Sequence, residues 1–292
     1  MKINEIRPQD NDYLKELESI ALKPKLLYYY GNWPEKRQKT VAIVGARKCS
    51  KYGEEIAYKL AKALGEKGII VISGLAYGVD SIAARGCLDG GGTTIAILGT
   101  EIERIYPTEH IPLAETIVGR GGVVASEYHV GDKIDRKLTF LARNRIISGL
   151  ADVVVVVEAR EKSGSLNTAS HALTQGKDLF AVPGDINRQT SQGCNRLIAS
   201  GANPFLSVED FLKYLFPNAK ARSKQAKEAQ ISLFAANDTE RAILTLLSSD
   251  VRDGEIIMET LGLDVTTFNQ SITMLEIKGA IRSLGANFWT LA

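Results

Sequence analysis

The sequence predicts a doubly wound α/β domain with a mostly parallel sheet, followed by a small winged-helix domain. From Lys39 onward, short β-branched runs alternate with longer amphipathic stretches, as expected for strands buried on both faces between helices. After a polar, basic stretch, three short helical patterns precede a terminal strand pattern. At 292 residues the chain has room for one large and one small domain.

The apolar runs and the periodic stretches between them define the elements of the large domain. The candidate strands are Thr40–Gly45, Ile69–Ser73, Thr93–Gly99, Val123–Ser126, Asp152–Ala159, Asp178–Pro183 and Pro204–Leu206. The candidate helices are Gly53–Lys67, Val79–Leu88, Ile111–Val118, Thr139–Leu150, Ser165–Gln175 and Val208–Phe216.

Composition shifts set the expected domain boundaries. Residues 1–38 contain a cluster of tyrosines and a tryptophan and are expected to pack on the large domain, residues 39–217. Residues 218–237 are small, polar and basic, which is typical of a flexible linker. In residues 238–292, helices beginning near Asp238, Gly254 and Val265 and a strand or hairpin at Ser283–Leu291 predict the winged helix.

Composition also excludes several classes of protein. The apolar run Val153–Val157 is far shorter than the roughly 18 to 20 residues of a membrane span, so no membrane association is expected. The first ten residues lack the apolar core of a secretory signal, and the three cysteines are widely spaced. We therefore expect a cytoplasmic protein.

Charge is divided unevenly along the chain. Residues 236–292 carry eight acidic and four basic side chains, a net charge of −4, so the remaining residues carry +6 of the total of +2. A polyanionic partner should therefore meet the large domain rather than the winged helix. The expected recognition helix of the winged helix has Lys278 as its one basic residue, which favours a protein or intramolecular partner over DNA.

The common enzymatic signatures are absent from the sequence. Gly45-Ala46-Arg47 places an arginine where a dinucleotide fingerprint needs its second glycine, and no P-loop, zinc-protease helix or serine-nucleophile elbow occurs. We therefore expect no cofactor and no metal. The strand-to-helix loops, which meet at one edge of a parallel sheet, instead combine glycines, basic residues and aromatics. This combination favours single-stranded nucleic acid, whose phosphates and base faces are both accessible.

Several linked motifs resemble the DNA-processing protein A family, DprA or Smf. In order along the chain, they are GARKCSKYG, SGLAYGVDSIAARG, RNRIISGLADVVVVVEA, SGSLNTASHALTQGKDLFAVPGDI and GCNRLIASGA. The resemblance implies a non-enzymatic Rossmann-like protein that binds and protects incoming single-stranded DNA. It further implies a homodimer that loads the RecA recombinase during natural transformation and recombination, with single-strand-binding protein as another partner.

Carried over position by position, the resemblance implies a single-stranded DNA site. Arg47 matches a phosphate-binding residue, and Phe140 matches an aromatic residue able to stack a base, although Leu141 replaces the family's usual proline. The full set implied is Arg47, Ser50, Gly74, Lys137, Phe140, Arg143, Arg145, Ser163, Gly164 and Ser165. A candidate self-association face on the last helix of the large domain consists of Phe211, Leu212 and Leu215.

Each of these residues also has a purely structural interpretation. Gly74 and Gly164 could serve tight turns, Arg143 and Arg145 a buried hydrogen-bond network, and Lys137 a solvated face. Phe140 and the apolar residues of the self-association face could be core. The alternative function is a Rossmann-like nucleotide-processing enzyme resembling phosphoribohydrolases, but the P-G-G-x-G-T signature of that group is missing.

Overall fold

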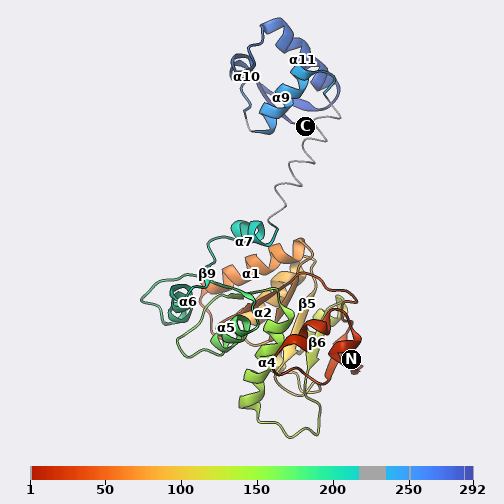
Figure 1. Ribbon diagram of the computed structural model, residues 1–292, viewed down its shortest axis with the longest axis vertical. Helices are drawn as coiled ribbons and strands as arrows, with labels where there is room; N and C mark the ends of the chain where they lie inside the picture. Colours follow the sequence, from red (N-terminus) through yellow and green to blue (C-terminus); the bar gives the residue numbers. More distant parts are fainter. Residues whose placement is uncertain (1, 217–234, 250, 286, 292) are drawn as a thin grey trace. The chain divides into compact units, whose positions relative to one another are not determined.

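The computed structural model describes residues 2–216, 235–249, 251–285 and 287–291, apart from the side chains of residues 136, 137 and 291 (Figure 1). The described chain forms two compact units, Met1–Leu212 and Lys213–Ala292. Most of the predicted linker, 218–237, lies outside the described residues.

The large unit is built on one mostly parallel sheet. In the described residues its strand order is β1-β2-β6-β5-β4-β3-β7-β8-β9, with antiparallel pairing only at β1 and β2. The strands are β1 (Asn4–Ile6), β2 (Leu27–Gly31), β3 (Thr40–Val44), β4 (Ile70–Ser73), β5 (Thr94–Leu98), β6 (Val123–Ser126), β7 (Val153–Val156), β8 (Asp178–Ala181) and β9 (Asn203–Pro204). The predicted doubly wound fold is confirmed.

Helices connect the parallel strands. They are α1 (Lys51–Glu66), α2 (Val79–Asp89), α3 (Ile111–Gly119), α4 (Arg136–Leu150), α5 (Gly164–Thr174), α6 (Gln189–Ala199) and α7 (Val208–Leu215), with short 3-10 helices η1 (Pro8–Asp10), η2 (Leu14–Ser19) and η3 (Thr108–His110). The sequence analysis did not predict α6, because the polar residues of its first turn are typical of a loop. It also placed the start of α4 three residues too late.

The side chains of each central strand alternate between two apolar cores. Ile95 and Ile97 of β5 lie in the core under α4, α5 and the N-terminal 3-10 helix η2, whereas Ala96 and Leu98 lie in the core under α2 and α3. The five residues of β3 are all buried. Burial on both faces explains why these strands appear in the sequence as continuous apolar runs.

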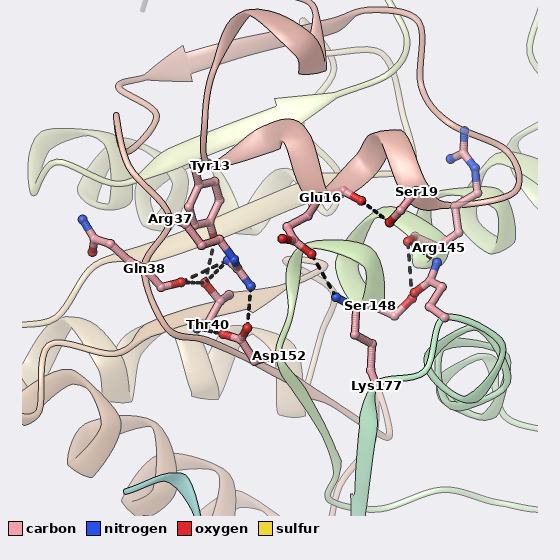
Figure 2. A network of polar contacts seen from close by, with 11 residues as sticks. Tyr13, Glu16, Ser19, Arg37, Gln38, Thr40, Arg145, Ser148, Asp152 and Lys177 are labelled. Carbon is pink, nitrogen blue, oxygen red and sulfur yellow. Dashed lines mark hydrogen bonds and ion pairs between the residues drawn. The ribbon is translucent and has the colours of Figure 1, made fainter.

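The N-terminal segment covers the end of the sheet at which the parallel strands β3 and β7 begin, which we call the closed edge (Figure 2). The hydroxyl of Tyr13 lies 2.9 Å from that of Thr40, the first residue of β3. The Asp152 carboxylate, just before β7, accepts hydrogen bonds from the backbone N–H of Thr40 at 2.7 Å and from the guanidinium of Arg37 at 2.8 Å. Strands β1 and β2, which the sequence analysis did not predict, extend the sheet beyond β6.

The second unit has the predicted winged-helix elements. They are α9 (Asp238–Ser248), α10 (Gly254–Leu261), α11 (Val265–Ile277) and the hairpin of β10 (Ile281–Gly285) with β11 (Phe288–Leu291). The side chains of Asn237, Asp253 and Asp264 cap the three helices. Across the described ranges of both units, no helix is long and apolar enough to cross a bilayer.

The Tyr13–Thr40 contact allows a direct test of this closure. Tyr13→Phe keeps the fully buried ring but removes one hydrogen bond, so we expect a loss of about 1 kcal/mol in the free energy of unfolding. Tyr13→Ala should lose about 3–5 kcal/mol, because it also leaves a cavity. Urea unfolding, followed by the fluorescence of Trp33 in a Trp289→Phe background, measures both. Equal losses in the two variants would contradict this assignment.

Candidate nucleic-acid interface

A cleft of about 430 Å³ opens at the carboxyl ends of β3 and β7. The loop after β3, the loop after β7 and one side of α4 form its walls, as expected for a ligand site in an open α/β sheet. Among the predicted site residues, those that line it are Arg47, Phe140, Arg143, Ser163, Gly164 and Ser165.

Arg143 forms the floor of the cleft. Its side chain is 5% exposed and donates hydrogen bonds to the backbone carbonyl of Gly74 at 2.9 Å and to that of Ile97. The buried Asp80 carboxylate accepts from the N–H of Gly74 at 3.1 Å. These contacts tie α4 to the ends of β4 and β5, so Arg143 has a structural role whatever else it binds.

The electrostatics of this floor follow from burial. Burial lowers the pKa of Arg143 to about 10, although the neighbouring Asp80 carboxylate raises it. Burial also raises the pKa of Asp80, and the Arg143 guanidinium opposes that rise. Arg143 therefore remains a cation at neutral pH, and its hydrogen bonds and the neighbouring Asp80 carboxyl group compensate for its removal from water.

Gly74 makes room for this guanidinium. A Cβ atom on Gly74 would lie 2.5 Å from both terminal nitrogens of Arg143. The glycine is thus explained by packing. Gly164 differs, because a Cβ there would meet no heavy atom within 4 Å. Its exposed backbone faces open space at the start of α5, where helix N–H groups favour an anion.

Four exposed cations surround the buried floor: Arg47, Lys48, Arg160 and Lys162. In the described part of the chain none of the four forms an ion pair. Cations left without carboxylate partners in one cleft attract a polyanion. Across the same residues, no group of three His, Cys, Asp or Glu side chains is placed to hold a metal.

One aromatic ring, that of Phe140, lines the cleft. The Arg47 guanidinium carbon lies 5.5 Å from the centroid of the Phe140 ring, within the range of a cation–π contact. Phe140 also packs edge-on against Tyr106, with ring centroids 5.9 Å apart, and Tyr106 is 45% exposed. The cleft therefore offers both cations and aromatic surface.

Of the predicted site residues outside the cleft lining, Ser50 and Arg145 are held by other partners. The Ser50 hydroxyl donates to the buried carboxylate of Glu158 at 2.6 Å, and Ser50 caps α1. Arg145 donates to Glu127 at 2.7 Å and to the carbonyl of Leu22 at 2.6 Å. In this structure both side chains stabilise the fold.

The remaining predicted residues are placed as follows. Lys137 lies in the first turn of α4, and its side chain is outside the described part of the structure. Phe211 is 2% exposed and packs against Phe180 at a centroid distance of 4.9 Å. Leu215 is also buried, and Leu212 is half-buried. The self-association face stays a prediction.

The site prediction missed three cationic residues of the cleft: Lys48, Arg160 and Lys162. The signal was present, because all three occupy loops that directly follow central strands.

The winged helix differs from this cleft in that its basic residue Lys278 forms an ion pair. Lys278, next to α11, pairs at 2.7 Å with Glu240, whose side chain is 3% exposed. The basic charge beside the expected recognition helix therefore has a partner within its own unit.

The two glycines of the site should respond differently to substitution. Gly74→Ala should lower the free energy of unfolding by about 1–3 kcal/mol, because the new methyl group collides with a pinned guanidinium. Gly164→Ala should change it by less than about 0.5 kcal/mol, since the position is open. Urea denaturation of the two variants provides the comparison. If Gly74→Ala were as stable as the wild type, Arg143 would not fill this space.

Comparisons with known proteins agree with this architecture. Residues 4–216 match the family described as DNA recombination-mediator protein A, and residues 225–287 match the DprA winged helix domain. The DNA processing protein DprA of Streptococcus pneumoniae is 41% identical over 203 residues, which cover 70% of this chain and 71% of that protein. Protein Smf of Escherichia coli K12 is 32% identical over 288 residues, covering 96% of this chain and 76% of that protein.

Solved structures are also similar to this chain. The X-ray structure of Streptococcus pneumoniae DprA has a TM-score of 0.65 at 39% identity and covers 73% of this chain and 74% of that one. The Helicobacter pylori DNA processing protein A, described for its single-stranded DNA binding mode, has a TM-score of 0.65 at 30% identity, with coverages of 75% and 97%. The chain belongs to the DNA recombination-mediator protein A family.

Proposed function

We propose that this protein binds single-stranded DNA in the cleft at the carboxyl ends of β3 and β7. One observation carries the proposal: four exposed cations, which form no ion pair within the described residues, line the same cleft as the Phe140 ring, and Tyr106 packs against that ring. Cations bind phosphates, and aromatic rings stack on bases that are free of a complementary strand. A duplex would use only the charges, because its base faces are covered.

The helix start beside the cleft adds a second kind of phosphate contact. The Ser163 side chain caps α5, and the Gly164 backbone that follows is exposed. A phosphate can approach this backbone closely, because no side chain stands in front of it. The single-stranded DNA binding mode described for the Helicobacter pylori relative supports the same class of ligand.

We further propose the role that the family resemblance implies. The protein would act in the cytoplasm as a binding protein rather than an enzyme, protecting incoming single strands and loading the RecA recombinase on them. It would do so as a homodimer, with single-strand-binding protein on the same DNA. The acidic winged helix, with a net charge of −4 over residues 236–292, suits a protein partner better than a nucleic acid.

The cleft cations should determine the affinity and salt dependence of DNA binding. Arg47→Gln and Lys162→Gln should each weaken the binding of a labelled poly-dT oligonucleotide. Each should also reduce the slope of log K against log salt concentration by about 0.7, the value for one lost contact to a single strand. Fluorescence anisotropy between low and moderate salt, with an unlabelled duplex as competitor, measures both effects.

Lys67→Gln is the matched control for these variants. Lys67 is exposed and follows the last residue of α1, about 24 Å from the cleft end of that helix. The substitution Lys67→Gln removes one positive charge from the same domain, as Arg47→Gln and Lys162→Gln do. If Lys67→Gln weakened binding as much as Arg47→Gln, only the net charge of the domain would matter. Failure of the wild type to bind would exclude the proposal, and hydrolysis of nucleoside monophosphates would then be assayed.

Recombinase loading can be tested separately from DNA binding. On oligonucleotides coated with single-strand-binding protein, the wild type should shorten the lag of the DNA-dependent ATPase of RecA. Arg47→Gln should lose this effect at protein concentrations where its DNA occupancy is low. A lag that stays unchanged with the wild type, at saturating DNA occupancy, would contradict the loading role and leave the DNA-binding role intact.

A further inference from the structure

We propose that the bound single strand leaves the cleft across the carboxyl ends of β7 and β8, where Tyr52 stacks one of its bases and Arg188 binds a phosphate. This inference rests on the proposed function and extends its site. The extension subsite consists of Tyr52, Arg160, Ile186 and Arg188. Only Arg160 of this set also lines the cleft.

Tyr52 is an exposed ring held in a fixed orientation. It is the second residue of α1, next to the cleft, and is 42% exposed. Its hydroxyl donates to the backbone carbonyl of Pro183 at 3.1 Å. Because the strand order is β3-β7-β8, this hydrogen bond spans the end of β7. An aromatic face that is already oriented loses little entropy when a base stacks on it.

The loop that receives this hydrogen bond is itself rigid. The backbone N–H and C=O of Gly184 both bond to the side chain of Asn195 in α6, at 3.1 and 2.9 Å. The turn that follows is closed by the N–H of Arg188 donating to the carbonyl of Asp185 at 3.0 Å. This turn presents Ile186, which is 79% exposed, and the exposed side chain of Arg188.

Backbone contacts fix the new subsite relative to the cleft. The N–H of Gly193 donates to the carbonyl of Ala159, and the N–H of Ala159 donates to the carbonyl of Thr190, both at 2.8 Å. Arg160, which follows Ala159, therefore stands between the cleft and the loop after β8. Two interstrand spacings of about 4.8 Å separate β3 from β8, so the subsite is within reach of the next one or two nucleotides.

The distribution of charge favours a DNA path across the ends of β7 and β8 over a path toward the loops that follow β5 and β6. Around the ends of β7 and β8, exposed cations outnumber exposed carboxylates. The cations are Arg160, Lys162, Arg188 and Arg196, and the carboxylates are Glu161, which pairs with Arg196, and Asp185. Among the described side chains of loops 99–109 and 127–135, exposed Glu109, Asp132 and Asp135 outnumber exposed Arg104 and Lys133. On that side the hydroxyl of the exposed Tyr77 donates a hydrogen bond to the Glu109 carboxylate at 2.7 Å. Among these described side chains, the excess of positive charge therefore lies at the extension subsite, where it attracts a phosphate backbone.

The test compares oligonucleotide lengths. For dT4, Tyr52→Leu should bind within twofold of the wild type, whereas Arg47→Gln should already be weakened. For dT12 and dT20, Tyr52→Leu should lose about fivefold or more in affinity, the lower bound for one base–aromatic stack. Its salt slope should stay unchanged, because no charge is removed. Arg188→Gln should also affect only the longer oligonucleotides, with a slope lower by about 0.7.

A spectroscopic readout separates stacking from a structural effect. A single 2-aminopurine is placed in turn at each position of dT12, and its fluorescence is measured on binding. At one position, Tyr52→Leu should quench this fluorescence less than the wild type does, whereas Tyr52→Phe should quench it as the wild type does. Tyr58→Leu is the matched control. Tyr58 lies on the same helix and also uses its hydroxyl in a hydrogen bond, to Asp89 at 3.0 Å, but it belongs to the contact with α2.

The outcomes are distinct. If Tyr52→Leu and Arg188→Gln bind every length like the wild type while Arg47→Gln does not, the extension subsite is wrong and the cleft remains. If Tyr52→Leu weakens dT4 as strongly as dT20, Tyr52 belongs to the cleft and the proposed path is overturned. If the wild type binds no oligonucleotide, the proposed function and this inference both fail.

Discussion

The buried guanidinium of Arg143 is the constraint on which the binding edge depends. A cation in a nearly dry site needs acceptors, and the ends of two central strands supply them through the carbonyls of Gly74 and Ile97. The requirement for acceptors fixes the position of α4 against the sheet. It thereby places Phe140, one turn earlier on the same helix, beside Arg47. The combination of cations and an aromatic ring in one cleft follows from this one placement.

The two edges of the sheet are built for different purposes. At the edge where β3 and β7 begin, the charged groups have partners: Asp152 binds Arg37 and the start of β3, and Tyr13 covers the same corner. At the opposite edge, the exposed cations Arg47, Lys48, Arg160 and Lys162 form no ion pair with any described carboxylate, although pairing them would reduce repulsion. The closed edge joins the N-terminal segment to the sheet, whereas the open edge retains unbalanced positive charge, which suits an external polyanion.

Much of the fold could be predicted because its signals are local. Apolar runs define β3 to β8, and the loops that follow them must meet at one edge, so Arg47 was correctly predicted to lie at the carboxyl edge of the sheet. Partners distant in the sequence could not be predicted in the same way. No local pattern shows that β2 pairs antiparallel with β6, or that Arg145 would bind Glu127. Gly74 resembles any turn glycine until the guanidinium beside it is seen.

The central claim, that DNA occupies the cleft and not the winged helix, is tested most directly by hydrogen exchange of the full chain with and without a poly-dT oligonucleotide. The account predicts slower exchange of backbone amides at residues 46–50 and 162–166, with no change over α11. Protection confined to residues 265–282, with the loops after β3 and β7 unaffected, would contradict it.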